Sequence, residues 1–155
     1  MSRATGFLGI LLALFLALSL VSCKQQGTTT GTGTGTGAGP TTTGGVKWLT
    51  SPEAAQAQAK QENKHVLVDF YADWCGYCKK MDEETYTDPS VSSLINNNFV
   101  PLKVNSDTNR ALSGKYKVTG LPTVIIMDAN GTEVGRITGY EPPNQFKADL
   151  SKYQK

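Results

Sequence analysis

The stretch Trp74-Cys75-Gly76-Tyr77-Cys78 carries two cysteines separated by two residues, and the segments on either side of it predict how the chain folds. Residues 65–72 (HVLVDFYA) precede it and are rich in β-branched and aromatic side chains, as expected of a buried strand. Residues 79–86 (KKMDEETY) follow it and suit an amphipathic helix. The sequence therefore predicts a cysteine pair at the point where a buried strand passes into a helix.

That position would activate Cys75. Unpaired backbone N–H groups and the positive end of the helix dipole favour a thiolate over a thiol, and the thiolate is the attacking species in disulfide exchange. Cys78 follows about one helical turn later, so the two sulfurs can close a small ring. One cysteine can then attack a substrate disulfide while the other resolves the mixed disulfide that results.

Two plainer roles for the pair are open. A structural disulfide here would close a very short loop, for which the gain in chain entropy is smallest. Half of a zinc site is the other role, but zinc usually takes four Cys, His or carboxylate ligands. The sequence offers only one histidine, His65, and one further cysteine, Cys23. We therefore favour a redox pair over a zinc site, and a zinc site over a structural staple.

Two separated motifs resemble the thioredoxin superfamily: residues 68–79 (VDFYADWCGYCK) and residues 120–123 (GLPT). Within it the chain is similar to exported thioredoxin-like proteins and to the C-terminal domain of the membrane thiol:disulfide interchange reductases, through YADWCxxCK, TYTDPSV and TGLPT. The resemblance covers roughly residues 46–155, the size of one domain. It implies an α/β fold: a thioredoxin-like three-layer α/β/α sandwich with a mixed central sheet.

The resemblance also implies catalytic roles. Cys75 matches the exposed nucleophile and Cys78 the buried resolving thiol, so the redox-active group is the Cys75–Cys78 disulfide and no cofactor is needed. Asp69 matches the buried aspartate that helps the resolving cysteine lose its proton, and burial in a low dielectric raises a carboxyl pKa. Pro122 matches a cis proline that faces the pair. The substrate groove would include Trp74, Gly76, Tyr77, Leu121 and Thr123.

Several of these residues have a plainer interpretation. Asp69 interrupts an apolar strand and could be an acid on a half-exposed edge, while Pro122 could be a trans proline opening a strand, where proline is tolerated. Trp74 could fill a gap in the core. One departure also matters: thioredoxins usually carry Gly-Pro between the cysteines, and this chain has Gly76-Tyr77. That difference leaves the redox potential, the partner and the direction of electron flow open.

The first residues have the features of an export signal. Arg3 supplies a positive charge, and residues 7–21 form a 15-residue run without charge. That run is shorter than the roughly 20 residues that cross a bilayer. Leu20-Val21-Ser22-Cys23 resembles the lipobox of bacterial lipoproteins, which implies that residues 1–22 are removed and that Cys23 is lipidated. The alternative is an ordinary signal peptide with a leftover thiol.

A low-complexity segment follows the predicted lipidation site. Residues 27–45 contain only Gly, Thr, Ala and Pro, so they cannot bury enough surface to offset the entropy of ordering. We expect a disordered tether over residues 23–45, with a glycosylated stalk as the alternative. The domain would then occupy residues 46–155.

The rest of the chain predicts alternating strands and helices. Ser51-Pro52 suits a helix start, and Asp88-Pro89 suits a helix break. Helices are expected over residues 53–63, 90–96, 107–116 and 142–153, and strands over residues 48–49, 99–104, 123–127 and 132–138, the last two antiparallel across a turn at residues 128–131.

The resulting hypothesis is a membrane-tethered, extracytoplasmic thiol:disulfide oxidoreductase, more specifically a reductase. Its substrates would be protein disulfides or dithiols, and its electron donor a membrane thiol:disulfide reductase. We expect a monomer. Nucleic-acid binding is not expected, because the net charge is only +2 and there is no basic patch. Lys24 after the lipobox cysteine points to the periplasmic face of the outer membrane in a Gram-negative cell and to the cell surface in a Gram-positive one.

Four other functions are alternatives to this hypothesis. A copper-handling module could use Cys75 and Cys78, since thiolates suit Cu(I), but Met and His ligands are missing near the pair. A disulfide oxidase is open because the spacing does not set the direction of exchange, whereas an isomerase would usually bring a dimerisation domain. A Cys–His hydrolase is disfavoured because His65, the only histidine, is the first residue of a strand that is predicted to be buried in the core.

Overall fold

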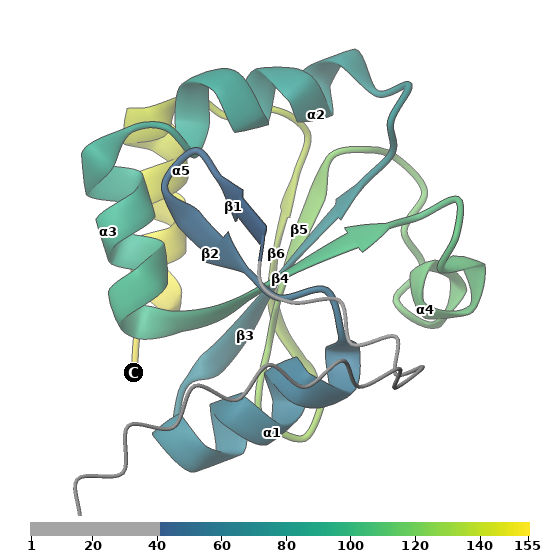
Figure 1. Cartoon of the computed structure of the whole chain (residues 1–155), viewed down its shortest axis with the longest axis vertical. Helices are drawn as coiled ribbons and strands as arrows, with labels where there is room; N and C mark the ends of the chain where they lie inside the picture. The colour runs from purple at the N-terminus through teal and green to yellow at the C-terminus, as the bar shows by residue number, and fades with distance from the viewer. Residues whose placement is uncertain (1–40) are drawn as a thin grey trace, which may run out of the picture. The chain divides into compact units, whose positions relative to one another are not determined.

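A mixed four-stranded sheet forms the middle of the fold in the computed structural model, which describes residues 41–155 (Figure 1). The strand order is β4-β3-β5-β6. β3 (His65–Tyr71) is parallel to β4 (Phe99–Asn105) and antiparallel to β5 (Thr123–Met127), and β6 (Glu133–Thr138) is antiparallel to β5. The strand that leads to the cysteine pair is therefore central, which explains why its sequence is almost wholly apolar.

Helices cover both faces of this sheet (Figure 1). On one face, α1 (Pro52–Glu62) and α4 (Arg110–Lys115) pack over a cluster that includes Val68, Phe70 and Ile125. On the other face lie α2 (Gly76–Lys80), its continuation η1 (Met81–Thr85), α3 (Pro89–Asn98), α5 (Pro143–Leu150) and the short η2 (Ser151–Tyr153). The cluster beneath them includes Leu67, Val124 and Ile126. The predicted three-layer α/β/α sandwich with a mixed sheet is confirmed.

The predicted helix start at Ser51 and the predicted turn at residues 128–131 form as the local sequence indicates, and Asp88, where the sequence predicts a helix break, also caps the next helix. The Ser51 hydroxyl accepts a hydrogen bond from the Ala54 N–H at 3.2 Å, and the Asp88 carboxylate accepts one from the Ser90 N–H at 2.8 Å. Both residues cap a helix whose first residue is proline. Between β5 and β6, Asp128 closes the turn by accepting from the backbone N–H groups of residues 130 and 132.

Three predicted helices differ from the observed ones. The helix expected over residues 79–86 begins earlier and changes type, because η1 is a π-helix in which the Tyr86 N–H donates to the Met81 carbonyl at 2.9 Å. The helix expected over residues 107–116 begins only at Arg110, because residues 105–109 form side-chain-supported turns. The closing helix ends at Leu150 and continues as one 3-10 turn.

Residues 41–45 correct the predicted extent of the tether. They belong to a β-hairpin in which β1 (Thr41–Thr43) pairs antiparallel with β2 (Val46–Trp48). Composition misled the prediction here, because a hairpin can be held by backbone pairing and by two glycines in the turn, Gly44 and Gly45, both at positive φ. Residues 1–40, with the predicted signal peptide, Cys23 and the rest of the tether, lie outside the described residues. Within residues 41–155, no helix is long and apolar enough to cross a bilayer.

We predict that Gly44→Ala destabilises the domain. Gly44 has φ +59°, and a Cβ placed there would lie 2.5 Å from the Tyr86 carbonyl carbon, so the hairpin would have to move. The expected loss in the free energy of unfolding is about 1–3 kcal/mol, measured by urea denaturation of the oxidised protein. The matched control is Gly114→Ala, where nothing lies within 4 Å of the new Cβ and the helix should tolerate it. Equal midpoints for the two variants would show that the hairpin does not constrain this position.

Candidate active site

Cys75 and Cys78 form a disulfide at the start of α2, shortly after the end of β3, and their Cα atoms are 5.3 Å apart. Cys75 is the N-cap of α2, and its sulfur accepts a hydrogen bond from the Cys78 backbone N–H at 3.1 Å. The predicted placement of the pair at a strand-to-helix junction is confirmed. When the disulfide is reduced, this N–H donor would favour negative charge on the Cys75 sulfur over the neutral thiol.

The two cysteines are almost equally covered. Cys75 is 5% exposed and Cys78 is 4% exposed, so the expectation that Cys75 would be clearly the more exposed is wrong for the disulfide form. The reason is packing: both cysteines contact Ala72, and Tyr71 and Leu121 pack against this group. A partner would therefore reach the sulfurs only at the rim of a small apolar cluster.

The loop before β5 contributes to that rim. The Leu121–Pro122 peptide bond is cis, as the sequence predicts, and Leu121 packs against the cysteines. Thr123 differs from its predicted role, because its side chain is buried and its hydroxyl donates to the Gly120 carbonyl at 2.7 Å. Thr123 thus closes the proline loop from inside and does not line a groove.

A groove lies beside the pair on the Trp74 side, with a volume of about 200 Å³. Trp74 is 71% exposed, which rules out its alternative role as a core filler, and its indole N–H donates to Asp107 at 2.9 Å. Sequence reasoning missed most of the lining, because the turn after β4 meets the cis-proline loop only in the folded chain. The lining residues are Trp74, Ser106, Asp107, Val118, Thr119, Gly120 and Leu121.

The other side of the pair carries a second exposed aromatic residue. Tyr77 is 64% exposed and stacks on Tyr140, with ring centroids 6.4 Å apart. Lys80 places its ammonium 4.4 Å from the Tyr140 ring centroid, and the Tyr140 hydroxyl donates to Glu84 at 2.5 Å. That hydrogen bond raises the pKa of Tyr140. Tyr77 is therefore held by a neighbour that no sequence motif identified.

Asp69 is buried inside the domain. It is 2% exposed, which rules out the half-exposed edge position. It lies on the same sheet face as Leu67, which packs against residues of η1, because alternate side chains of a strand share a face. Lys103 of β4 reaches both carboxylates: its ammonium lies 3.1 Å from Asp69 Oδ2 and 2.5 Å from Asp82 Oδ1. The sequence offered no sign of this ion-pair network.

Burial and charge act against each other in this network. Burial raises the pKa of Asp69, and the Lys103 ammonium only partly offsets that shift. For Lys103, burial lowers the pKa, but the charges of Asp69 and Asp82 outweigh it and the pKa is raised. Asp69 therefore holds a proton at a higher pH than an ordinary aspartate does, beside a lysine that stays charged.

The network reaches the cysteines through the helix. Cys78 and Asp82 are four residues apart on the continuous α2–η1 segment, so they lie on about the same side of it. Lys103 connects Asp82 to Asp69. Asp69 on β3 is thus linked, through Lys103 and Asp82, to the side of the helix that carries Cys78.

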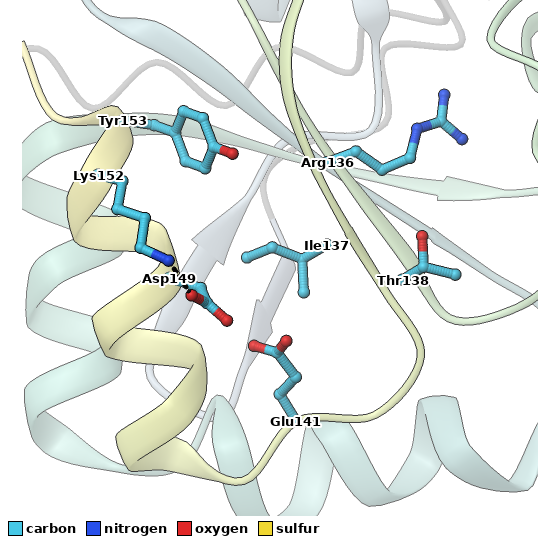
Figure 2. A pocket seen from close by; sticks show the side chains of 7 residues that line it. All are labelled: Arg136, Ile137, Thr138, Glu141, Asp149, Lys152 and Tyr153. Atoms are coloured by element: carbon cyan, nitrogen blue, oxygen red, sulfur yellow. Dashed lines mark hydrogen bonds and ion pairs between the residues drawn. The ribbon is translucent and has the colours of Figure 1, made fainter.

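A second cavity, of about 240 Å³, lies between β6 and α5 (Figure 2). Figure 2 shows the ion pair between Lys152 and Asp149, with Glu141 nearby. None of the predicted site residues lines this cavity. Among residues 41–155, no group of three or more His, Cys, Asp or Glu side chains is placed to hold a metal ion.

The chain matches known proteins over the part that forms this site. The family described as thioredoxin-like domain matches residues 52–154. Thiol:disulfide interchange protein DsbD of Haemophilus ducreyi is 39% identical over 105 residues, which are 64% of this chain and 18% of that protein. The protein of the same name from Salmonella typhi is 37% identical over 111 residues, 68% of this chain and 19% of that one. The chain thus spans about a fifth of the length of these relatives.

Solved structures agree with the observed topology. A thioredoxin from Thermus thermophilus superposes with a TM-score of 0.63 at 32% identity, covering 70% of this chain and 86% of that one. The oxidised C-terminal domain of DsbD from Neisseria meningitidis gives 0.59 at 25% identity, covering 66% and 91%. The sheet order, the disulfide at the start of α2 and the cis proline before β5 all lie within the matched region, and the chain belongs to the thioredoxin-like domain family.

Proposed function

We propose that this chain is a thiol:disulfide oxidoreductase that exchanges its Cys75–Cys78 pair with the disulfides or dithiols of protein partners. The observation that carries the proposal is the disulfide at the start of α2, whose Cys75 sulfur accepts the Cys78 N–H. A disulfide across two residues adds little stability, so its position is better explained by reactivity. The similarity to proteins named thiol:disulfide interchange proteins supports the same activity.

In the reducing direction, the reaction begins with both cysteines as thiols. Cys75 loses its proton, and its thiolate attacks one sulfur of the partner disulfide. A Cys75–partner disulfide forms, the partner's own S–S bond breaks, and its second sulfur leaves as a thiolate that takes up a proton. The backbone N–H of Cys78 favours the attacking charge on Cys75.

Resolution uses Cys78 and Asp69. The Cys78 thiol gives its proton to the Asp69 carboxylate, and the resulting thiolate attacks the Cys75 sulfur. The Cys75–Cys78 bond forms, the mixed disulfide breaks, and the partner's remaining sulfur leaves as a thiolate that takes up a proton. The partner has then gained two electrons and two protons, and Asp69 releases the Cys78 proton to regenerate its carboxylate. Burial raises the pKa of Asp69 towards the working pH, where a general base is most effective.

The surroundings of the pair suit a protein partner. Trp74 and Tyr77 are large exposed aromatic residues on either side of the disulfide, and Gly76 between the cysteines leaves open space. Aromatic side chains of this kind often dominate protein interfaces. In our proposal Leu121 and the cis Pro122 border the bound segment of the partner, and the groove beside Trp74 accepts its side chains.

The cellular setting is also a proposal. The lipobox-like Leu20-Val21-Ser22-Cys23 supports a lipid anchor on an extracytoplasmic membrane face, with the Gly/Thr-rich tether between anchor and domain. The similarity to DsbD supports a reductase fed with electrons by a membrane thiol:disulfide reductase. The domain would work as a monomer and without a bound cofactor.

We predict that Cys78→Ser traps a covalent adduct with a disulfide-containing substrate such as insulin. Without Cys78 the mixed disulfide on Cys75 cannot be resolved, so a band of higher mass should appear on non-reducing gels and vanish with dithiothreitol. The matched variant Cys75→Ser should trap little adduct. If Cys75→Ser traps an adduct and Cys78→Ser does not, Cys78 is the nucleophile and Cys75 the resolving cysteine. If neither variant traps an adduct and the wild type binds Cu(I) tightly, a copper-handling module is favoured.

We predict that Asp69→Asn keeps the fold but slows resolution of the mixed disulfide by about tenfold or more near pH 7. The amide occupies the same volume but cannot accept the Cys78 proton. Stopped-flow single turnovers between pH 5 and 9 should show that the difference in resolution rate between the wild type and Asp69→Asn becomes smaller at high pH. There the Cys78 thiol ionises without a base. The control is Asp73→Asn, which removes the same charge from an exposed position close to the pair.

The stability of the same variant should depend on pH in a defined direction. Because burial raises the pKa of Asp69, ionising it costs the folded state more than the unfolded state. Wild-type stability should therefore fall as the pH rises from the ordinary aspartate range through the raised value. Asp69→Asn should not show this loss, so its free energy of unfolding should rise relative to that of the wild type over the same pH range. Parallel stability curves for the two proteins would contradict a raised pKa at Asp69.

We predict that Cys23→Ala releases the protein from membranes, because the lipobox-like pattern is the proposed anchor. Several acyl chains on one cysteine hold a protein far better than a single chain does. Fractionation of cells expressing the full chain, with Cys78→Ala as a control that keeps Cys23, would measure the effect. If the Cys23 variant still sediments with membranes like the control, lipidation at this cysteine is not what anchors the chain.

A further inference from the structure

Tyr86 places a hydroxyl in the core that the mechanism above does not use. Its side chain is fully buried, and its hydroxyl makes no regular hydrogen bond with any described residue. The ring cannot swing away, because it packs edge-on against Trp48, with centroids 5.0 Å apart, and against Phe146, with centroids 5.7 Å apart. A polar group held rigidly in the core costs free energy unless it finds a hydrogen-bond partner.

The neighbouring group is the carboxyl of Asp69. Lys103 lies near both residues, with its ammonium 5.4 Å from the Tyr86 ring centroid and 3.1 Å from Asp69 Oδ2. Asp69 Oδ1, the oxygen that Lys103 does not bind, is likewise buried and without a regular hydrogen bond. The Tyr86 hydroxyl lowers the pKa of Asp69 as a nearby donor, and the charge of Asp69 raises the pKa of Tyr86, although no regular hydrogen bond joins the two side chains. A donor and an acceptor thus lie close together, both unsatisfied.

We propose that Tyr86 is a positioning residue for disulfide exchange, whose hydroxyl donates to Asp69 Oδ1 when that carboxylate is ionised and so sets the pH at which Asp69 accepts the Cys78 proton. The inference rests on the proposed exchange reaction. No electrons move in this step: the proton passes from the Cys78 sulfur to the Asp69 carboxylate, and the tyrosine keeps its own.

Towards the Asp69 carboxylate, the Tyr86 hydroxyl can act only as a donor. Burial raises the pKa of Tyr86 well above its ordinary value, and the charges of Asp69 and Asp82 raise it further. Tyr86 therefore stays protonated at any pH at which the protein would work. A neutral O–H that donates to a carboxylate stabilises the ionised form, so it lowers the pKa of Asp69 against the larger effect of burial.

Other ionisable groups lie near Asp69 and Tyr86 and also influence the pKa of Asp69. Lys103 from β4 lowers the pKa of Asp69, and Asp82 from η1 raises it. Tyr71 of β3 places its ring 5.1 Å from the Lys103 ammonium, and Cys78 lies on about the same side of the helix as Asp82. All of these groups remain when the Tyr86 hydroxyl alone is removed, so its contribution can be isolated.

Tyr86→Phe is the variant that tests the proposal. The ring and its contacts with Trp48 and Phe146 remain, and only the donor is lost. We expect the acid limb of the single-turnover resolution rate to move to higher pH by about 0.5–1 pH unit, the worth of one hydrogen bond. The rate should fall a few-fold on that limb and be unchanged at alkaline pH.

The matched control is Tyr116→Phe. That residue is also buried, and its hydroxyl donates to the Gly131 carbonyl at 2.8 Å in the other core cluster. Its pH profile should superpose on that of the wild type. A double-mutant cycle completes the test: in the Asp69→Asn background, Tyr86→Phe should have no further effect on the profile.

A readout without turnover separates the inference from the proposed function. Carbon-13 NMR titration of the Asp69 carboxyl in the oxidised protein should show a higher pKa in Tyr86→Phe than in the wild type and in Tyr116→Phe. An unchanged Asp69 titration, or equal shifts in both phenylalanine variants, would overturn the role of Tyr86 whatever the activity. A shifted titration in a protein that fails to exchange disulfides would instead overturn the proposed function.

Discussion

The ion pair of Lys103 with Asp69 and Asp82 is the interaction on which the site depends. It joins β3, β4 and the helix that carries Cys78, and it does so inside the protein, where charges are costly unless paired. A lysine between two carboxylates leaves one of them imperfectly compensated, and burial then raises the pKa of Asp69. One arrangement thus holds the helix against the sheet and provides a group that can accept a proton.

The surface that a partner would meet around the disulfide consists of aromatic side chains more than of the sulfur atoms. Both cysteines are nearly covered, whereas Trp74 and Tyr77 beside them are open to solvent. Trp74 is tied to Asp107, and Tyr77 rests on Tyr140. Because these contacts hold the rings in place, less conformational entropy would be lost when a partner binds. A Tyr77 in the position where thioredoxins usually have proline extends the apolar rim towards Tyr140.

Local signals predicted most of the fold. The apolar run of residues 65–71, the helix start at Ser51, the helix break at Asp88 and the Asp128 turn each depend on neighbours a few residues away, and all of them form. The predictions that failed concern backbone pairing and side-chain burial, which neither composition nor a family resemblance reveals. Residues 41–45 join a hairpin despite their composition, Thr123 turns inward to Gly120, and Cys75 is as covered as Cys78.

The sequence by itself determined that a cysteine pair begins a helix after a buried strand, that an aspartate interrupts that strand and that a proline opens a later apolar strand. These features follow from spacing and residue type along one segment. Only the tertiary structure decided that Lys103 meets Asp69, because that meeting depends on the parallel register of β3 and β4. It also decided that Tyr86 and Tyr140 border the site, since the π-turn of η1 and the loop after β6 bring them there, and no local pattern specifies either.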